Sequence, residues 1–529
     1  MTQDPIKTDK KIFTLSSQFA HKLKTPEELA ALIGPRPREK SVIMCHGVFD
    51  VVHPGHLRHL LYAKSHADIL VTSLTADSHI GKAAYRPHIP QDLRALNLAA
   101  MEMVDYVVID ANPTPIENIA KIQPDYFAKG YEYFADGLPP KTQAEVEALQ
   151  AYGGELIFTP GDVVYSSSKF INAAPPALRL DKLVTLMEKA DLTFGDLHGA
   201  LDKFAGLRVH VVGDTIVDSY TRTSMIGGQT KTPTMSVLYE GRTDFIGGAG
   251  IVADHLRAAG AQVIFSTVLG SDDLGQFVID GLTKSGVEIR PVIDKKRPTT
   301  NKNAIVAGGY RLLKIDTLDN TSISDPILKA ICSQIAETPA DAIVFSDFRH
   351  GLFNRRTIPP LIKSIPPGMF KAADSQVASR WGNITEFKGF DLITPNEREA
   401  RFALADQDSG VRPLASSIYA AAECGLLLLK LGDRGVLAVR NGNSATDRDS
   451  SFVIDSFVDR LVDAVGAGDA LLAYAVLAKL ATGSEYIAGI LGSLAAACEC
   501  ECDGNVPIAP ADVKAKLESV ERQLRYAET

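Results

Sequence analysis

The sequence predicts an α/β protein with two domains, each built around a β-sheet. Residues 41–45 form a short apolar run without alternation that ends at Gly47, which is typical of a strand buried on both faces of a parallel sheet. Residues 207–212 form a second apolar strand, which ends at Gly213 and Asp214. With 529 residues, the chain is long enough for two domains that each bury a substantial core.

The first predicted strand leads into the segment His53-Pro54-Gly55-His56, after which apolar residues up to Lys64 have helical spacing. Pro54 and Gly55 therefore stand at a helix start, where free backbone N–H groups and the positive end of the helix dipole attract phosphate. Two imidazoles three positions apart can both face a bound triphosphate and donate hydrogen bonds to an α-phosphate under attack. The alternatives are a zinc pair or two surface histidines, although no Cys or carboxylate stands nearby at the usual zinc-ligand spacing.

Residues 41–172 resemble the nucleotidyltransferase superfamily that contains glycerol-phosphate cytidylyltransferases and heptose-phosphate adenylyltransferases. The resemblance starts with residues 46–56 and continues in the same order with residues 86–94, 127–133 and 165–169. It implies a Rossmann-like domain over residues 41–175, in which His53 and His56 stabilise the transition state and Lys129 approaches phosphate. By the same resemblance, the nucleotide is bound by Gly47, Phe49, Asp50, Arg86, Arg94, Ser166, Ser167 and Ser168. Glu132 stands where this family more often has an Asp.

A domain boundary is predicted at Ala173-Ala174-Pro175-Pro176, because helices rarely cross such a segment. Two stretches with helical character follow it, Leu178–Ala190 and Phe194–Phe204. They predict a helical linker over residues 176–205 that connects or packs the domains or contributes to a dimer contact. Residues 1–40 precede the first strand as an N-terminal extension.

The second domain carries two aspartates and a glycine cluster in its first part. Asp214 and Asp218 stand where the sugar would bind if this domain is a kinase; the alternative is a turn Asp followed by a helix-start Asp. Gly247 and Gly248 lie in a glycine cluster before a predicted helix, a pattern that also serves tight turns.

The most informative segment of the second domain is Leu461–Asp469, which precedes a helical stretch that runs to Leu480. Small residues at positions 466–468 let backbone N–H groups surround an anion at the helix start, and Asp469 beside them is placed to act as a base for a sugar hydroxyl. Such a site positions an acceptor, stabilises charge and removes one proton, as phosphoryl transfer requires. The alternative is an ordinary glycine-rich helix start with a first-turn acid.

Residues 206–525 resemble the ribokinase-like (PfkB) carbohydrate kinases, through residues 212–214, 247–248, 394–399 and 466–469. The similarity extends to the kinase half of the bifunctional heptose-phosphate kinase and adenylyltransferase family of lipopolysaccharide precursor synthesis. It implies an α/β domain with a small β lid over residues 206–529, in which Asp469 is the base and Asn396 and Glu399 organise Mg²⁺ and phosphate-bound water. It also assigns nucleotide contacts to Lys430, Gly432, Gly435, Gly466, Ala467 and Gly468, and substrate contacts to Asp214, Asp218, Gly247, Gly248 and Lys302.

Four positions depart from the kinase pattern. Ile251 stands where these kinases commonly have an Asn near the sugar, and Ala304 stands where a basic residue is expected. Gln376 replaces the lysine of a usual Asp-Pro-Lys, and Ala464 replaces a Ser or Thr before the anion-binding turn. The domain order is also the reverse of the fused family, which places the kinase first. The departures concern the acceptor sugar more than phosphate transfer.

Composition predicts a cytoplasmic protein that binds small molecules. The formal net charge of -9, with 45% hydrophobic and 22% charged residues, argues against binding to nucleic acid or to an anionic membrane. Residues 1–11 lack the apolar stretch of a secretory signal, and no apolar run approaches the roughly 20 residues of a membrane span. The six cysteines are expected to be reduced, and Cys498, Cys500 and Cys502, which alternate as on a strand, are expected to be small core-side residues instead of metal ligands.

Together these patterns predict a bifunctional enzyme of nucleotide-activated sugar synthesis. The second domain is expected to transfer the ATP γ-phosphate to a sugar phosphate with Mg²⁺. The first is expected to transfer a nucleotidyl group from ATP or CTP to a sugar 1-phosphate, releasing pyrophosphate. The resemblance implies D-glycero-β-D-manno-heptose 7-phosphate as substrate, ADP-heptose as product, a homodimer and a monovalent cation at the kinase site. Two alternatives stay open: another sugar or polyol phosphate with CTP, and a scaffold that senses nucleotide or sugar through an altered kinase pocket.

Overall fold

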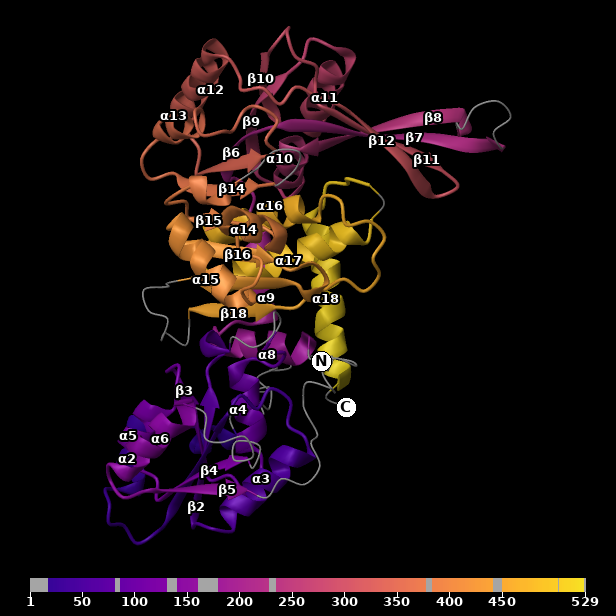
Figure 1. Ribbon diagram of the computed structural model, residues 1–529. Helices are drawn as coiled ribbons and strands as arrows, with labels where there is room; N and C mark the ends of the chain where they lie inside the picture. The colour runs from indigo at the N-terminus through magenta and orange to yellow at the C-terminus, as the bar shows by residue number, and fades with distance from the viewer. Residues whose placement is uncertain are drawn as a thin grey trace, which may run out of the picture. The chain divides into compact units, whose positions relative to one another are not determined.

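The computed structural model describes residues 18–80, 86–130, 140–159, 179–227, 235–376, 383–440, 450–502 and 504–527. The described residues up to 159 form one compact unit, and those from 179 onwards form a second. Each unit has its own central sheet with helices packed on it (Figure 1). The prediction of an α/β protein with two sheet-based domains is confirmed.

The sheet of the first unit is parallel throughout and has the strand order β3-β2-β1-β4-β5. Its strands are β1 (Val42–Gly47), β2 (Ile69–Thr75), β3 (Tyr106–Asp110), β4 (Tyr126–Gly130) and β5 (Glu155–Thr159). Its helices are α2 (Pro26–Ile33), α3 (Pro54–Lys64), α4 (Gln91–Ala99), α5 (Ile116–Ile122) and α6 (Pro140–Gln150). The chain order reverses between β1 and β4, so their carboxyl ends flank the crevice where sheets of this kind bind ligands.

Strand β1 explains why its sequence lacks alternation. Ile43 and Cys45 point into a core shared with α3 and α4, while Val42 and Met44 point into a core shared with α2, α5 and α6. All four side chains are completely buried. Leu29 of α2 is buried in the second of these cores, so the described part of the expected N-terminal extension packs as part of the first unit.

The main sheet of the second unit has nine strands in the order β10-β9-β6-β13-β14-β15-β16-β17-β18. They are β6 (Arg208–Gly213), β9 (Gln262–Leu269), β10 (Glu288–Ile293), β13 (Ala342–Asp347), β14 (Phe370–Ser375), β15 (Leu392–Ile393), β16 (Leu426–Lys430), β17 (Val436–Arg440) and β18 (Ser451–Ile454). The strands from β10 to β16 are parallel, and β17 and β18 close the edge in antiparallel fashion. The helices are α10 (Ala249–Ala258), α11 (Asp273–Ser285), α12 (Asp325–Glu337), α13 (Ile358–Lys363), α14 (Glu397–Leu404), α15 (Val411–Ala422), α16 (Ala467–Thr482), α17 (Glu485–Cys500) and α18 (Pro510–Ala527).

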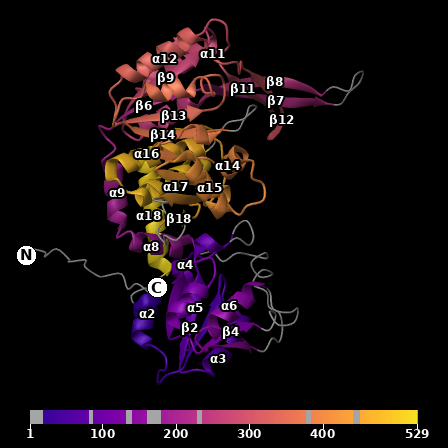
Figure 2. The same ribbon diagram turned by 60° about the vertical axis from the view of Figure 1, so that its left-hand side comes forward.

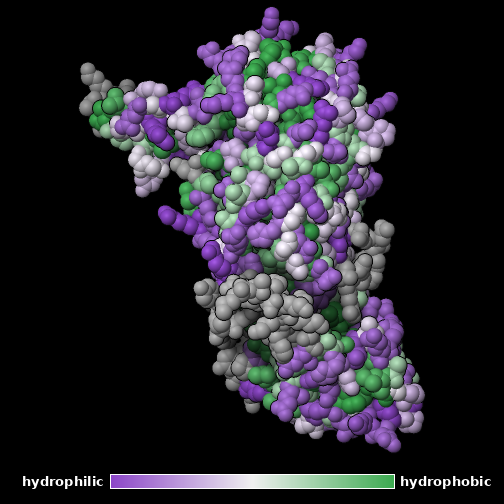
Figure 3. Space-filling model, turned by 180° about the vertical axis from the view of Figure 1, so that it is seen from behind, coloured by the Kyte–Doolittle hydropathy of each residue, from purple (hydrophilic) through white to green (hydrophobic). Residues whose placement is uncertain are grey.

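A smaller sheet projects from the second unit as a lid (Figure 1). It has the order β12-β11-β7-β8 and consists of β7 (Thr215–Gly227), β8 (Ser236–Gly248), β11 (Asn301–Ala307) and β12 (Tyr310–Thr317). Asp218 therefore lies in strand β7, which excludes the alternative of a helix-start aspartate. The side chains of Leu238, Tyr239 and Leu313 on this lid are exposed. Figure 3 shows hydrophobic residues among hydrophilic ones on one face of the molecule.

The predicted linker segment contributes two helices to the second unit, α8 (Arg179–Lys189) and α9 (Phe194–Asp202). Leu183 and Leu197 are buried in the same core as α16, and the ring of Phe204 lies 5.8 Å from that of Tyr474. Helix α9 lies beside α16, α17 and α18 (Figure 2). The described part of this segment is thus packed into the second unit rather than left as a free connection.

The cysteine cluster was expected on a strand, and this prediction is wrong. Cys498 and Cys500 lie in the last turn of helix α17, and Cys502 follows it. The alternating Cys and Glu residues continue the apolar helical run that begins at Ile487. This longer run decides the secondary structure, whereas the alternation over a few residues suggests a strand. All six cysteines are free thiols. None of the helices described is both long enough and apolar enough to cross a membrane.

Candidate active sites of the two units

The two predicted histidines lie together at the first turn of α3, after the carboxyl end of β1. His53 is the N-cap of this helix, and its Nδ1 accepts a hydrogen bond from the backbone N–H of Gly55 at 3.1 Å. Because Nδ1 accepts, a neutral His53 carries its proton on Nε2, where it can be donated. The rings of His53 and His56 have their centroids 4.0 Å apart. The predicted pair therefore exists, with donors at a helix N-terminus.

Burial keeps these histidines neutral. It lowers the pKa of His56 to about 4, with further lowering by the charges of His53 and His59. Burial also lowers the pKa of His53. At neutral pH both rings are therefore uncharged hydrogen-bond donors rather than cations. Such donors can stabilise negative charge that develops on an oxygen atom in a transition state.

The residues around the histidine pair link β1 to the segment after position 85. The Oδ1 atom of Asp50 accepts hydrogen bonds from the backbone N–H groups of His88 at 2.8 Å and Ile89 at 3.0 Å. Its Oδ2 atom lies 3.9 Å from Nε of Arg86. Asp50 thus holds the Arg-Pro segment beside the helix start. The Cβ of any residue at Gly47 would lie 3.2 Å from the ring of Phe49, so that position has little room.

Two predicted nucleotide contacts of the first unit have other partners. Arg94 is completely buried and donates to the backbone carbonyls of Ile89 and Thr75 and to the carboxylate of Asp77. Arg94 therefore holds loops together, and a direct nucleotide contact is not supported. Lys129, at the end of β4, pairs with Glu145 and donates to Thr142. The predicted contacts of Ser166, Ser167 and Ser168 lie outside the described residues.

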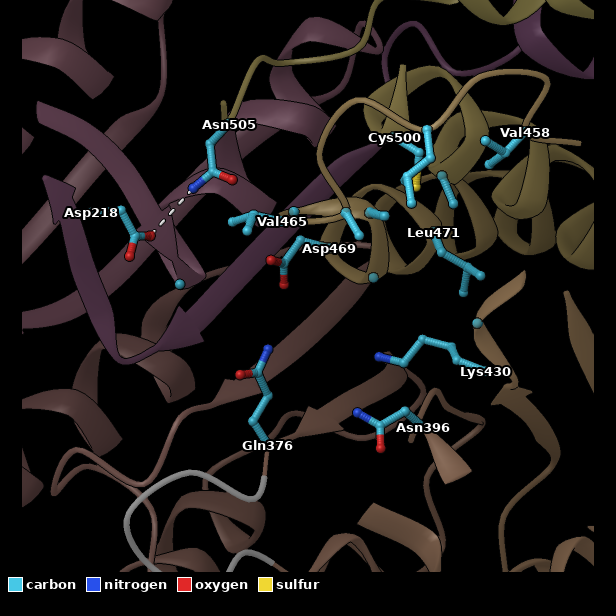
Figure 4. Close-up of a pocket in the computed structure, with 18 of the residues that line it drawn as sticks. Asp218, Gln376, Asn396, Lys430, Val458, Val465, Asp469, Leu471, Cys500 and Asn505 are labelled. Carbon is cyan, nitrogen blue, oxygen red and sulfur yellow. Dashed lines mark hydrogen bonds between the residues drawn. The ribbon is translucent and has the colours of Figure 1, made fainter. Parts of the chain in front are cut away.

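The predicted residues of the second unit converge on one cavity of about 1090 Å³ between the main sheet and the lid (Figure 4). The predicted residues that line it are Asp218, Gly248, Lys302, Asn396, Glu399, Lys430, Gly432, Gly435, Gly466, Ala467, Gly468 and Asp469. The departures Ala304, Gln376 and Ala464 line it as well. The sequence motifs, which lie far apart in the chain from Asp218 to Asp469, thus form a single site because parallel strands end at the same edge of the sheet.

Asp469 lies in the first turn of α16, directly after the glycine-rich N-cap. It is 7% exposed, and burial together with the negative charge of Asp374 raises its pKa well above that of an ordinary aspartate. A carboxylate with a raised pKa at a helix N-terminus is suited to take a proton from a hydroxyl group. Oδ1 of Asp469 is buried without a hydrogen-bond partner among the described residues.

Asn396 and Glu399 hold each other at the start of α14. The side chain of Asn396 accepts from the backbone N–H of Glu399 at 2.8 Å, and the Glu399 carboxylate accepts from the backbone N–H of Asn396 at 2.7 Å. This capping box fixes both groups at the cavity wall. Burial raises the pKa of Glu399 to about 7, an effect that Asp374 strengthens and Lys430 opposes.

These groups fit a magnesium ion that arrives with a nucleotide. The described part of the chain contains no cluster of three His, Cys, Asp or Glu residues that would hold a metal ion by itself. Mg²⁺ usually keeps several waters and is bound by one or two carboxylates together with substrate phosphates. Glu399, with its buried carboxylate at the cavity wall, meets that requirement.

Two predicted sugar contacts, Asp214 and Gly247, do not line this cavity, and neither does Ile251, one of the departures from the kinase pattern. Asp214 does not line the cavity: its carboxylate accepts from the backbone N–H groups of Phe348, His350 and Leu352 at 3.1 to 3.2 Å. It therefore fixes the loop after β13, and a sugar contact is not supported. Gly247 lies behind Asp218, because a Cβ there would be 2.3 Å from Oδ2 of that aspartate. Ile251 is buried in α10.

The sequence patterns did not reveal three further polar residues at this site. Asp374 accepts a hydrogen bond from Nζ of Lys430 at 2.9 Å, and Nδ2 of Asn505 donates to Asp218 at 3.4 Å. Glu499 is completely buried on α17, and burial raises its pKa to about 7. The sequence does contain one indication of Glu499, because it is an acidic residue inside an apolar helical run. Acidic residues are seldom fully buried unless they are paired or functional.

Replacing Gly466 by Ala is expected to weaken MgATP binding about 10-fold or more, because small displacements at a phosphate site are costly. Gly466 has φ +86°, and a Cβ there would lie 2.7 Å from Oε1 of Glu499 and 2.8 Å from Oδ1 of Asn505. The control is Gly483→Ala at the other end of α16, where φ is +72° and no atom lies within 4 Å. Both variants should lose about 1–2 kcal/mol of stability from the left-handed backbone. Equal nucleotide affinity in the two variants, measured by calorimetry, would contradict a tight anion site.

Comparison with known proteins agrees with this geometry. The family described as pfkB family carbohydrate kinase matches residues 207–511, and the family described as cytidylyltransferase-like matches residues 44–173. The bifunctional protein HldE of Desulfatibacillum aliphaticivorans is 28% identical over 324 residues, which are 60% of this chain and 64% of that protein. HldE of Campylobacter curvus is 39% identical over 120 residues, 22% of this chain and 25% of that protein.

The chain thus aligns with less than two thirds of the length of these curated relatives. The solved structure of ribokinase from Thermotoga maritima is 21% identical, covers 59% of this chain and 99% of that chain, and has a TM-score of 0.47. The kinase family match spans more than half of the chain and includes the cavity, its lid and the helix start at Asp469. The chain therefore belongs to the pfkB family of carbohydrate kinases, with a cytidylyltransferase-like region preceding the kinase region.

Proposed function

We propose that this chain is a bifunctional enzyme of nucleotide-activated sugar synthesis, with a sugar kinase in residues 206–529 and a nucleotidyltransferase in residues 41–175. Residues 1–40 and 176–205 flank these regions, and their described parts, residues 18–40 and 179–205, pack into the units. The observation that carries the proposal is the cavity in which Asp469, at the start of α16, faces the lid residues Asp218 and Lys302. A base, an anion-binding helix start and an acceptor wall meet there in one enclosed space.

In the kinase reaction, an acceptor hydroxyl lies between Asp469 and the γ-phosphate of ATP. Its oxygen forms a bond to the γ-phosphorus, its proton passes to the Asp469 carboxylate, and the bond from the γ-phosphorus to the bridging oxygen breaks, so that ADP leaves with the electron pair. Backbone N–H groups of residues 466–468 face the phosphate at the helix N-terminus. Glu399 and Asn396 would hold Mg²⁺, which would offset negative charge on the nucleotide phosphates.

In the nucleotidyl transfer, the oxygen of a sugar 1-phosphate attacks the α-phosphorus of a nucleoside triphosphate, and the bond to the β-phosphate breaks to release pyrophosphate. His53 and His56, both neutral, donate hydrogen bonds to the oxygens that gain charge. Lys129 completes the phosphate site when its ammonium leaves the carboxylate of Glu145 and binds a phosphate instead.

The acceptor of the kinase is proposed to carry a phosphate of its own. Lys302 on β11 and Arg311 and Lys314 on β12 line the cavity from the lid. Burial and the nearby Lys314 charge lower the pKa of Lys302, so a bound dianion would stabilise the charged form of this lysine. Lys314 pairs across the sheet with Ala304, so a basic side chain stands beside the position where the sequence lacks one. A heptose 7-phosphate meets this requirement.

Replacing Lys302 by Ala is expected to raise the KM for a phosphorylated acceptor about 10-fold or more, while kcat changes little, because the lost contact binds ground and transition states alike. The matched control is Lys295→Ala, an exposed lysine that does not line the cavity. Steady-state ADP release with a phosphorylated sugar and with its unphosphorylated form would measure the effect. An unchanged KM for the phosphorylated sugar would show that Lys302 of the lid does not bind the acceptor phosphate.

The experiment that tests the function uses the full chain with a panel of sugar phosphates and nucleotides, recording ADP release and pyrophosphate release separately. The proposal expects ADP release with D-glycero-β-D-manno-heptose 7-phosphate, and pyrophosphate release with ATP and the corresponding 1-phosphate. Pyrophosphate release with CTP but not with ATP would identify the first unit as a cytidylyltransferase that acts on another sugar or polyol phosphate. No turnover with any acceptor, despite nucleotide binding, would favour a sensing scaffold.

A further inference from the structure

Lys430 is a buried cation in the cavity of the kinase unit. It is the last residue of β16, its side chain is 15% exposed, and its Nζ atom donates to Oδ2 of Asp374 at 2.9 Å. In Figure 4 its side chain extends toward the middle of the cavity, between Asp469 and Asn396. Among the described residues that line the cavity, Lys430 is the single cation that does not belong to the lid.

The ammonium lies directly against the first turn of α16. A Cβ built on Gly468 would be 3.1 Å from Nζ of Lys430 and 3.6 Å from its Cδ. The absence of a side chain at position 468 is therefore what lets the ammonium reach the helix start. The free backbone N–H groups of that turn and the ammonium present positive charge to the same space.

The charges around Lys430 keep it protonated. Burial disfavours its charge, but the carboxylates of Asp374, Glu399 and Asp469 more than compensate and raise the pKa of Lys430. Oδ1 of Asp374, a residue that is 4% exposed, is buried without a hydrogen-bond partner among the described residues. A triphosphate that enters the cavity meets these acidic groups, so it needs the ammonium of Lys430 to offset their negative charge.

We propose that Lys430 is a catalytic residue of the kinase site: its ammonium donates to the γ-phosphoryl group during transfer, and Asp374 is the positioning residue that aims it. The proposal rests on the kinase function proposed above. As the bond from the acceptor oxygen to the γ-phosphorus forms and the bond to ADP breaks, negative charge on the phosphoryl oxygens is met by the ammonium and the N–H groups of residues 466–468. Gln376, which follows β14 and also lines the cavity, supplies no charge, so Lys430 provides it from β16.

The test measures binding of MgADP to the full chain by calorimetry, with and without aluminium fluoride, a mimic of the phosphoryl group in transfer. Aluminium fluoride should lower the Kd for MgADP in the wild type. In Lys430→Met, the tightening, measured as the ratio of the Kd for MgADP without aluminium fluoride to the Kd with it, should fall about 10²-fold, as for loss of one preorganised donor. Lys430→Arg should keep most of the tightening, because the positive charge remains.

Removing Lys430 alone leaves Asp374 as an unpaired buried charge, which can unfold the site. The double variant Lys430→Met with Asp374→Asn removes both charges and keeps the test valid, and the exposed Lys363→Met serves as a control. The proposed role of Lys430 is overturned if aluminium fluoride still tightens MgADP binding in the folded double variant. It is also overturned if aluminium fluoride does not tighten MgADP binding in the wild type. A wild type that fails to bind MgADP at all instead removes the proposed kinase function.

Discussion

Replacing Asp469 by Asn is expected to lower kcat for ATP-dependent phosphorylation about 10²–10⁴-fold, the usual contribution of a positioned general base. The affinity for MgATP should stay within about threefold, because the N–H groups that hold phosphate belong to the backbone of residues 466–468. Asn fills the same space as Asp but accepts no proton. The measurement is ADP release with the acceptor that the substrate panel identifies, combined with calorimetry of MgATP binding.

The pH dependence provides a second readout of the same group. Burial and Asp374 raise the pKa of Asp469, and a base acts only when it is ionised. The kcat of the wild type should therefore fall as pH decreases, with a midpoint clearly above the value near 4 of an ordinary aspartate. The residual activity of Asp469→Asn should lack that midpoint.

Asp273→Asn is the matched control for this variant, because Asp273 is an exposed first-turn aspartate of α11 in the same unit. It should change kcat by less than about twofold, as surface substitutions usually do. Equal turnover by wild type and Asp469→Asn would eliminate the assignment of the base. A loss of MgATP binding that matches the loss in kcat would assign Asp469 to nucleotide binding instead.

Replacing His56 by Ala is expected to lower pyrophosphate release about 10²–10³-fold, as when one preorganised donor to a transition state is removed. ADP release by the second unit should not change, because its cavity is lined by residues of that unit alone. His56 is a cleaner choice than His53, whose side chain also caps α3, a contact typically worth about 1 kcal/mol. The two products of one preparation thus provide an internal control.

His66→Ala is the control for a lost imidazole, since His66 is exposed just beyond the end of α3. The pH profile adds a further distinction. With the pKa of His56 lowered to about 4, pyrophosphate release should show no midpoint near 6.5 from this residue. A midpoint that disappears in His56→Ala would show that the ring works as a cation, and unchanged release would remove it from the reaction.

Local sequence patterns predicted the elements whose conformation short-range physics decides. Residues 41–45 became a strand buried on both faces because its alternate side chains face two separate cores. Pro54 and the N-cap His53 start α3, and the glycine at position 466, with φ +86°, starts α16. These are positions where one residue type restricts the backbone, so the sequence alone places them.

Residues whose role depends on distant partners were harder to interpret. Asp214 looks like a site carboxylate in the sequence, but three backbone N–H groups more than a hundred positions away occupy it. Arg94 looks like a phosphate ligand, but carbonyls of separate loops and Asp77 surround it. Cys498 and Cys500 alternate as in a strand, although the preceding run carries them into a helix.

The sequence by itself determined that this protein has two α/β units, each with a helix that starts at a proline or a glycine, because glycine, proline and apolar periodicity act within a few residues of one another. Only the tertiary structure decided which polar groups face the cavity. The pairing of Lys430 with Asp374 and the placement of Asn505 beside Asp218 join segments 56 and 287 positions apart. Burial and charge at such contacts depend on how the sheet brings strand ends together, which no short stretch of sequence contains.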